Sequence, residues 1–372
     1  MRVTIERSEF LKALSHVQSV VERRNTIPIL SNVLVQADGQ EIKLTATDLD
    51  IEAIETAPAE VSQGGATTAP AHMLYDIVRK LPDGAQREIE QGPDEHRLSV
   101  RCGRSQFALQ ALPSEDFPDL SAGELDHRFA MSAADIKRLI EKTRFAISTE
   151  ETRYYLNGIY LHEVEVDGAA MLRGVATDGH RLAQVQLPLP EGAAGMPGVI
   201  LPRKTVSELH RLIEDQDGEI DIALSQSKVR FSVGSLVLTS KLIDGTFPDY
   251  ERVIPKDNDK TMEVDAKLFA QAVDRVSTIS SEKGRAVKLN LEGEKLTLSV
   301  NNPDSGSAVA ELVATYESEP LDIGFNARYL LDITGQLTSD SASFLFADAG
   351  SPTIVRDKDD TTALYVLMPM RV

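Results

Sequence analysis

The feature that most constrains the fold of this chain is a short polar motif that occurs three times. The clearest copy, Val175–Leu182, reads V-A-T-D-G-H-R-L, and related copies lie at Thr45–Ile51 (T-A-T-D-L-D-I) and Ser299–Gly306 (S-V-N-N-P-D-S-G). Each copy is flanked by short runs of alternating apolar residues, which is typical of a tight turn between two antiparallel strands. The sequence therefore predicts three related strand–turn–strand units.

The spacing of two unrelated landmarks indicates a domain-sized repeat. Asp178 follows Asp48 by 130 residues, and Phe247 follows Phe117 by the same 130 residues within two F-P-D segments. The third copy has diverged further, because Asn302 follows Asp178 by 124 residues. Solenoid and propeller repeats are only ~20–50 residues long, so each copy here should be a whole domain. We expect domains at residues 1–125, 128–253 and 256–372.

Each expected domain shows the order helix, strands, helix, strands. Ser8 is the expected N-cap of the first helix, which should end near Arg24 because Pro28 cannot continue it. Apolar residues alternate with polar ones in most strands, a pattern of antiparallel sheet covered by helices on one face. The sequence predicts an α+β fold of three similar domains, each with antiparallel sheet and two helices. The later helices are expected at 71–80, 132–143, 203–215, 266–276 and 326–337.

Composition excludes several classes of protein. The net charge is −19, with 39 basic against 58 acidic residues, which argues against a uniformly basic nucleic-acid-binding surface. The charged first residues do not resemble a signal peptide, and no apolar run approaches the ~20 residues of a membrane span, so we expect a cytoplasmic location. The single cysteine, Cys102, lies in a strand-like segment and is expected to be a buried, inert thiol.

Two groups of polar residues were considered as reactive sites. Asp178 and His180 could form a carboxylate–imidazole pair for general acid–base catalysis, although the sequence shows no accompanying nucleophile motif. Asp357, Asp359 and Asp360 could gather a cation, but the run lacks the mid-loop Gly and the distal Glu of a calcium loop, so an exposed, solvated turn is favoured. No glycine-rich phosphate motif occurs. We therefore expect no metal and no cofactor.

Basic residues recur on the expected helices. For any one of them a solvated helix face is the simplest interpretation, but recurrence on equivalent elements suggests that the helices share a locally positive face within an acidic protein. The residues are Arg23, Arg24, Arg79, Lys80, Lys137, Arg138, Lys142, Arg144, Arg203, Lys204, Arg211, Lys267, Arg275 and Arg328.

The C-terminus is apolar almost to the last residue, whereas chain ends are usually polar unless they are docked. A final core strand is the simplest interpretation and is expected to hold for Tyr365 and Leu367. Met368 and Met370 flank Pro369, which breaks strand pairing, so this end also suits an adaptable surface for partner peptides.

Taken together, six motifs resemble the bacterial sliding clamp, the beta subunit of DNA polymerase III. They are R-Y-Y-L-N-G at 153–158, A-T-D-G-H-R-L at 176–182, L-P-R-K at 201–204, F-P-D-Y at 247–250, G-F-N at 324–326 and V-L-M-P-M-R at 366–371. The resemblance covers the whole chain. It implies the DNA clamp fold and a head-to-tail homodimer closed into a ring around duplex DNA, with helices lining the hole and sheets outside. It also implies a non-enzymatic processivity factor that binds the polymerase III alpha subunit, the clamp loader and other proteins through short peptides.

The resemblance also assigns roles to residues of this chain. The expected DNA contacts are Arg24, Arg153, Tyr154, Tyr155, Arg203 and Lys204. The expected subunit interface pairs Phe107 and Leu109 of one copy with Ile279 of the other. The expected peptide pocket comprises Leu156, Thr177, Gly179, His180, Arg181, Leu182, Pro248, Arg252, Val253, Asn326, Tyr329, Val366, Met368, Pro369, Met370 and Arg371.

Two departures from the family pattern bear on these roles. Glu150 and Glu151 stand beside the expected DNA-facing tyrosines, where acids would repel phosphate. Gly284 stands where relatives can carry a bulky side chain at the pocket rim. Two other hypotheses stay open at this point: a hydrolase that uses Asp178 and His180, and a peptide-binding scaffold that does not associate with DNA.

Overall fold

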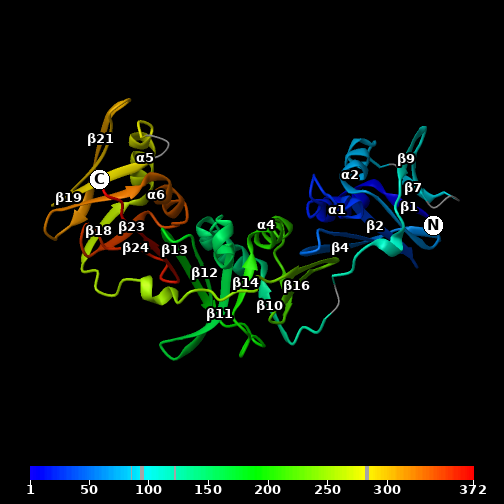
Figure 1. The fold of residues 1–372 in the computed structure, drawn as a ribbon, viewed down its shortest axis with the longest axis horizontal. Helices are drawn as coiled ribbons and strands as arrows, with labels where there is room; N and C mark the ends of the chain where they lie inside the picture. The colour runs from blue at the N-terminus through cyan, green and yellow to red at the C-terminus, as the bar shows by residue number, and fades with distance from the viewer. Residues whose placement is uncertain (85, 93–95, 121–122, 281–284) are drawn as a thin grey trace. The chain divides into compact units, whose positions relative to one another are not determined.

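The computed structural model describes residues 1–84, 86–92, 96–120, 123–280 and 285–372. Gly284, the expected pocket-rim difference, lies outside these ranges. The chain divides into two compact units: one comprises Met1–Ala134, Pro190–Ala194 and Ser207–Leu242, and the other comprises Asp135–Leu189, Gly195–Val206 and Ile243–Val372. Figure 1 shows the helices and strands of both. No helix within the described ranges is long and apolar enough to cross a membrane.

The first unit contains two antiparallel sheets. The smaller has the order β5-β1-β7-β8-β9 and the larger the order β10-β15-β16-β17-β4-β3-β2-β6. Helix α1 (Arg7–Gln18) packs against α2 (Ala71–Lys80) and β4. The strands of the smaller sheet are β1 Arg2–Glu6, β5 Glu60–Gln63, β7 Gln86–Gln91, β8 Arg97–Cys102 and β9 Ser105–Gln110. Those of the larger are β2 Asn32–Asp38, β3 Glu41–Thr47, β4 Ile51–Pro58, β6 Gly65–Pro70, β10 His127–Ser132, β15 Glu219–Leu224, β16 Lys228–Val233 and β17 Leu236–Lys241.

The second unit is built on one continuous antiparallel sheet of 12 strands in the order β14-β11-β12-β13-β25-β24-β23-β18-β21-β20-β19-β22. Helix α5 (Ala266–Ser277) packs against α6 (Ala327–Thr334). Helices α3 (Ala133–Thr143) and α4 (Arg203–Leu212) each have residues in both units. The strands are β11 Gly158–Val166, β12 Ala169–Thr177, β13 Arg181–Pro188, β14 Val199–Pro202, β18 Lys260–Asp265, β19 Ala286–Glu292, β20 Lys295–Asn302, β21 Gly306–Tyr316, β22 Leu321–Asn326, β23 Ser341–Phe346, β24 Thr353–Asp357 and β25 Ala363–Leu367.

The two large sheets run across the boundaries of the expected domains. In the first unit β4 pairs with β17, and in the second unit β13 pairs with β25, both antiparallel. In each case the second strand of a hairpin from one expected domain pairs with the last strand of the next domain. Adjacent domains are therefore joined by backbone hydrogen bonds as well as by side-chain packing.

The three repeated turns have the predicted strand–turn–strand structure. The Asp48 carboxylate accepts hydrogen bonds from the backbone N of Asp50 (2.9 Å) and Ile51 (2.8 Å) between β3 and β4. Asp178 does the same for His180 (2.9 Å) and Arg181 (3.1 Å) between β12 and β13. Asp and Asn favour such turns because their side chains can bond backbone amides two residues ahead. In the diverged third copy, the Asn302 side chain accepts from the N of Asp304 (3.0 Å).

The start of the first helix differs from the prediction. Glu6, not Ser8, is the N-cap, because its carboxylate accepts hydrogen bonds from the backbone N of Ser8 (2.6 Å) and Glu9 (3.2 Å). The helix ends at Gln18, so Arg23 and Arg24 follow it in an irregular segment rather than lying on it. The later N-caps Asp265 and Asn326 each bond a backbone amide of the first turn of their helix, as their side chains permit.

The interpretation of the C-terminal aspartates as an exposed turn was wrong for Asp357. The residue is 3% exposed, and its carboxylate accepts hydrogen bonds from the backbone N of Thr338 (2.6 Å) and Ser339 (3.2 Å) and from the hydroxyls of both residues. Burial alone would raise the pKa of Asp357, but the hydrogen bonds from Ser339 and Thr338 outweigh it and hold that pKa well below its usual range. Asp357 therefore ties β24 to the segment that follows α6.

Lys142 also departs from the expected basic helix face. Its side chain is buried, its Nζ donates to the backbone O of Gln336, and it lies 3.9 Å from Asp360. Burial lowers the pKa of Lys142. Cys102 is buried, and Tyr365 and Leu367 are fully buried on β25, as predicted.

Candidate functional site

The described residues of the second unit form a largely apolar pocket of about 340 Å³. Four segments supply its walls: the 3₁₀ segment Glu151–Leu156, the β12–β13 turn, residues 248–253, and β25 with the residue that follows it. The lining residues are Arg153, Tyr155, Leu156, Thr177, Gly179, Arg181, Leu182, Pro248, Asp249, Tyr250, Val253, Val366 and Met368.

A hydrophobic cluster forms the base of the pocket. Leu182 and Val366, which are directly paired on β13 and β25, are each 2% exposed and belong to one buried cluster with Leu156. The segment after β17 brings Phe247 onto the same cluster, where its ring stacks on Tyr160 at a centroid distance of 4.9 Å. A concave apolar floor with a few polar groups at its edge is typical of a site for an apolar ligand or peptide side chain.

The β12–β13 turn shapes one wall of the pocket. Gly179 has φ +88°, a left-handed conformation that is costly for residues with a Cβ. A Cβ atom at this position would lie 2.6 Å from Nη1 of Arg153. Because glycine has no Cβ, residue 179 can adopt the left-handed conformation of the turn and leaves room for Arg153 at the pocket wall.

Arg181 is a structural part of the wall. Its Nε donates to Asp178 (3.1 Å), its Nη1 to Asp332 (2.5 Å) and its Nη2 to the backbone O of Phe145 (2.6 Å). The guanidinium also lies over the ring of Tyr329, 4.3 Å from its centroid, and the side chain is only 8% exposed. Because these contacts use all three guanidinium nitrogens, Arg181 holds the turn against α6 and contributes mainly its shape to the pocket.

A polar group anchors the opposite wall. The Tyr250 hydroxyl lies 3.0 Å from Nη1 of Arg173 and 3.0 Å from Nε2 of His162. Arg173 also pairs with Glu251 at 3.0 Å. Burial raises the pKa of Tyr250 and lowers the pKa of His162, so the phenol and the imidazole are both neutral near pH 7.

The predicted pocket residues fall into two groups. Those on the lining are Leu156, Thr177, Gly179, Arg181, Leu182, Pro248, Val253, Val366 and Met368. The others are not among its lining residues. His180 is exposed and stacks on Tyr329 at 6.4 Å, Arg252 is exposed and pairs with Asp249 at 2.7 Å, and Asn326 caps α6. The last of them are Pro369, Met370 and Arg371, in the C-terminal tail after Met368.

Sequence reasoning missed four residues of the lining. Asp249 and Tyr250 lie within the F-P-D-Y motif, so the motif pointed to this segment. Of its residues, the resemblance assigned only Pro248 to the pocket. Arg153 and Tyr155 had been assigned to DNA instead. Arg153 is engaged by Glu150, with Nε–Oε2 at 2.8 Å and Nη2–Oε1 at 2.5 Å, so the neighbouring acid orients it at the pocket wall.

The other predicted DNA contacts are spread over several segments. Tyr154 is 53% exposed and lies beside Tyr155 with ring centroids 5.7 Å apart. Arg203 is exposed at the first position of α4, where Lys204 follows it. Arg24 is exposed after the end of α1.

The catalytic interpretation of Asp178 and His180 does not fit the geometry. The Asp178 carboxylate accepts from two backbone amides and from Nε of Arg181, while the His180 ring stacks on Tyr329. Both side chains thus have structural partners in the turn and in α6. Among the described residues no group of three or more His, Cys, Asp or Glu side chains is placed to hold a metal ion.

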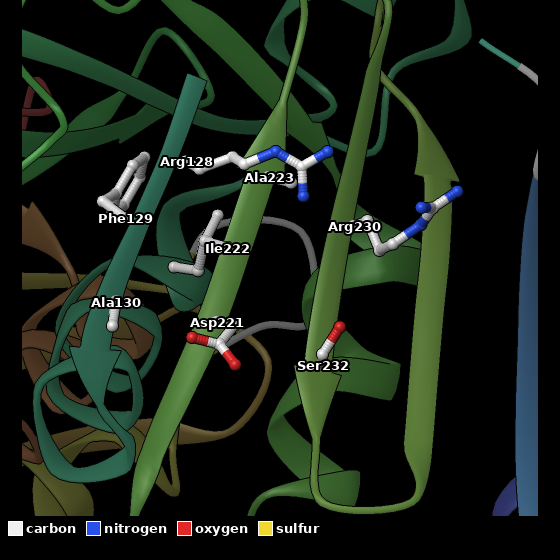
Figure 2. A pocket seen from close by; sticks show the side chains of 8 residues that line it. All are labelled: Arg128, Phe129, Ala130, Asp221, Ile222, Ala223, Arg230 and Ser232. Atoms are coloured by element: carbon white, nitrogen blue, oxygen red, sulfur yellow. The ribbon is translucent and has the colours of Figure 1, made fainter. Parts of the chain in front are cut away.

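A second hollow, of about 490 Å³, lies over β10, β15 and β16 in the first unit (Figure 2). Arg128, Ala223 and Arg230 are directly paired across these strands and so share one face. The Arg128 guanidinium lies over Ala223, whereas that of Arg230 extends away from it (Figure 2) and its Nε donates to Thr239 (3.3 Å). The two cations do not converge on one point, so this hollow lacks the features of the apolar pocket.

Comparisons with known proteins place this geometry in a family. The domain models of the DNA polymerase III beta subunit match residues 1–121 (N-terminal domain), 130–249 (central domain) and 251–371 (C-terminal domain). The beta sliding clamp of Caulobacter vibrioides is 56% identical over 372 residues, which is the full length of both chains. The chain belongs to the DNA polymerase III beta subunit family. The beta sliding clamp of Escherichia coli K12 is 39% identical over 373 residues and is also covered in full.

Solved beta clamps have the same fold. The Bartonella birtlesii clamp bound to griselimycin superposes with a TM-score of 0.97 at 56% identity, with both chains covered completely. The Caulobacter crescentus beta clamp, with PEG bound to a putative beta-motif tethering region, superposes with a TM-score of 0.98 at 56% identity and covers 100% of this chain and 99% of that one. The predicted α+β clamp fold is confirmed.

The repeat places different side chains at the two equivalent strand pairs of this clamp chain. Leu182 pairs with Val366 at the β13–β25 junction, whereas 130 residues earlier Glu52 pairs with Thr239 at the β4–β17 junction. Glu52 is 2% exposed and accepts a hydrogen bond from the backbone N of Leu120 (3.2 Å). A carboxylate thus stands at the position equivalent to Leu182 and bonds the backbone of Leu120.

Proposed function

We propose that this protein is a sliding clamp: two copies close head to tail around duplex DNA, and the apolar pocket of each copy tethers a replicative polymerase through a short peptide. Its role is to keep the polymerase on DNA, and it performs no chemistry itself. Family membership over the whole chain supports this function, and so does the absence of a reactive geometry at Asp178. The observation that carries the tethering role is the apolar pocket beside the C-terminus.

The strand pairing inside the chain supports a head-to-tail dimer. The pairs β4–β17 and β13–β25 each join the second strand of a hairpin to the last strand of a following domain. β21 is the second strand of the corresponding hairpin in the third domain, so it should also pair with the last strand of another domain. β17 and β25 are the last strands of the second and third domains, and the last strand of the first domain is β9. Within the described residues β9 pairs with β8 only, and residues 306–313 of β21 pair with β20 only. We infer that β21 of one copy pairs with β9 of the other, which leaves neither edge open.

The exposed side chains at these edges fit that interface. Val309 and Val313 on β21 are 65% and 82% exposed, which is unusual for valine in a strand. Phe107 is partly buried on β9 and Ile279 is partly buried just after α5, so both retain surface for a partner. Leu109 is only 5% exposed and would support Phe107 from the core.

A substitution at the edge of β21 tests the dimer. We expect Val313→Lys to convert a dimer into a monomer, because it places a charge in an apolar strand-pairing surface. Ile27→Lys is the matched control: Ile27 is 45% exposed but lies outside both edge strands. Sedimentation velocity at several protein concentrations measures the outcome. A Val313→Lys protein that sediments as the wild-type dimer would refute this interface.

The pocket should take the apolar side chains of a partner peptide, such as leucine and phenylalanine from the polymerase alpha subunit or the clamp loader. Leu156, Leu182 and Val366 offer an apolar floor, and burying a side chain of that size contributes ~1.5–3 kcal/mol. Because the Bartonella birtlesii clamp binds griselimycin, we propose the same pocket as the griselimycin site here. Deleting residues 368–372 should abolish peptide binding, as measured by fluorescence anisotropy, and should leave the dimer intact.

Retention on DNA distinguishes the clamp from the alternatives. Protein loaded by a clamp loader onto nicked circular DNA should co-elute with the circle through gel filtration and should be lost when the circle is cut to a linear molecule. Retention that survives linearisation would indicate ordinary DNA binding, and no retention in either case would favour a scaffold that works without DNA. The experiment is run at 0.15–0.2 M salt (roughly physiological), where non-specific phosphate contacts are weak.

A further inference from the structure

The C-terminal tail crosses between two elements that are far apart in the sequence. The backbone N of Met368 donates to the O of His180 (2.9 Å), and the backbone N of Met370 donates to the O of Gly324 (2.8 Å). Met370 and Gly324 form an antiparallel bridge, so the tail docks on β22, the last strand of the 12-stranded sheet. The tail is therefore fixed at both ends, on the β12–β13 turn and on β22.

The tail approaches β22 closely at Gly324. Alternation along β22 places Ile323 and Phe325 in the core and Asp322 and Gly324 on the opposite face. Asp322 is exposed, whereas Gly324 is buried. A Cβ atom on Gly324 would lie 2.3 Å from Cγ1 of Val372 and 2.7 Å from the backbone O of Met370.

The backbone of Gly324 does not itself require glycine. Gly324 is not among the residues with positive φ, and glycine inside a strand costs roughly 0.5–1 kcal/mol relative to alanine. A glycine that is unfavourable for the strand and not required by its dihedral angles indicates a close approach of another segment. Here that segment is the tail, which continues from Met368 at the pocket.

We propose that Gly324 is a positioning residue for the pocket: its missing side chain lets Met370 and Val372 seat on β22, and this seating fixes Met368 at the pocket wall. The proposal rests on the peptide-binding function proposed above. A side chain at position 324 would unseat the tail after Met368, while the backbone hydrogen bond from Met368 to His180 remains. The side chain of Met368, which is 40% exposed, would then lose the support of the residues that follow it, and the pocket wall would loosen although no lining residue had changed.

The test compares Gly324→Ala with Gly218→Ala in the full-length protein. An added Cβ at Gly218 meets no atom within 4 Å and its φ is not positive, so this variant controls for the change of glycine itself. Two readouts are needed: the rate at which carboxypeptidase removes the last residues, and the Kd for a fluorescein-labelled peptide with adjacent leucine and phenylalanine. We expect Gly324→Ala to be digested faster and to bind the peptide about tenfold more weakly, a loss of ~1.4 kcal/mol. Gly218→Ala should match the wild type in both.

A second variant separates tail seating from general damage to the fold. Val372→Gly removes the two Cγ atoms that a Cβ at position 324 would meet, so Gly324→Ala combined with Val372→Gly should bind more tightly than Gly324→Ala alone. Unchanged digestion of Gly324→Ala would overturn the proposal, and so would faster digestion with unchanged peptide affinity. If the wild type bound no peptide, the proposed function would fail, whereas faster digestion of Gly324→Ala would still support Gly324 as the residue that seats the tail.

Discussion

Nη1 of Arg181 lies 2.5 Å from Oδ2 of Asp332, which joins the β12–β13 turn to helix α6 across 151 residues of sequence. The same guanidinium bonds Asp178 and the backbone O of Phe145 and covers the ring of Tyr329. One cation thus holds together three segments that surround the pocket. Its low exposure makes these contacts stronger than those of a surface ion pair.

Arg181→Lys should destabilise the protein even though the charge is kept. Lysine lacks the planar guanidinium that donates to Asp178, Asp332 and the backbone O of Phe145 at the same time. We expect the free energy of unfolding to fall by about 2 kcal/mol, which a lower urea midpoint would show. Arg252→Lys is the control, since Arg252 pairs with Asp249 on the surface and its side chain is 83% exposed. Equal midpoints for both variants would show that the Arg181 contacts contribute little.

Gly179→Ala should weaken peptide binding. The substitution introduces a Cβ at φ +88° and moves Arg153, whose Nη1 would otherwise lie 2.6 Å away. Gly168→Ala is the matched control, because it carries the same backbone strain at φ +80° with no atom within 4 Å. Both variants should lose about 1 kcal/mol of stability, but only Gly179→Ala should lower the affinity for the peptide. Equal affinities would mean that Arg153 adapts without affecting the pocket.

Leu49→Gly should raise the melting temperature. Leu49 occupies the position of Gly179 in the first copy of the turn, with φ +79°, and 39% of it is exposed. A left-handed conformation destabilises a residue that has a Cβ by ~1–2 kcal/mol, and glycine removes this strain. Glycine also increases the conformational entropy of the unfolded chain, which offsets part of the gain in stability. Leu49→Ala keeps the strain and serves as the control. We expect the glycine variant to exceed the alanine variant by about 1 kcal/mol in differential scanning calorimetry.

Glu52→Gln should stabilise the protein at neutral pH. Burial is the main reason that the pKa of Glu52 is raised above its ordinary value of 4.5, and its buried Oε1 has no hydrogen-bond partner among the described residues. Because the folded pKa is the higher one, ionisation opposes folding: the cost is absent below about pH 4.5 and grows as the pH rises through the folded pKa. The free energy of unfolding of the variant should therefore exceed that of the wild type by about 1 kcal/mol at pH 8 and should be almost the same at about pH 4.

Urea titrations of wild type and Glu52→Gln across this range check the sign. A constant difference at all pH values would exclude ionisation of Glu52 as the cause. Gln184→Leu offers a comparison, since the buried side-chain O of Gln184 also has no hydrogen-bond partner in the described part of the chain, and an amide does not titrate. Its effect should not depend on pH.

Much of the fold could be predicted because the relevant interactions are local. Asp48 and Asp178 bond backbone amides two or three residues away, so their turns were visible as sequence motifs. The first helix was placed less well, because Glu6 and Ser8 are both plausible caps and only the coordinates show which oxygen accepts the amides. The family motifs then supplied pocket residues such as Leu182 and Val366, although the motifs alone did not show that these two pair.

The sequence by itself determined the repeat, the turns and the family, because these depend on residue types at short and regular spacing. Only the tertiary structure decided which residues line the pocket beside the β13–β25 pair. Arg181 lies on the pocket lining, and its partner Asp332 and the ring of Tyr329 come from a different expected domain. Asp357, expected in a solvated turn, is buried by the segment after α6. Such contacts depend on strand register and long-range packing, and no local pattern encodes them.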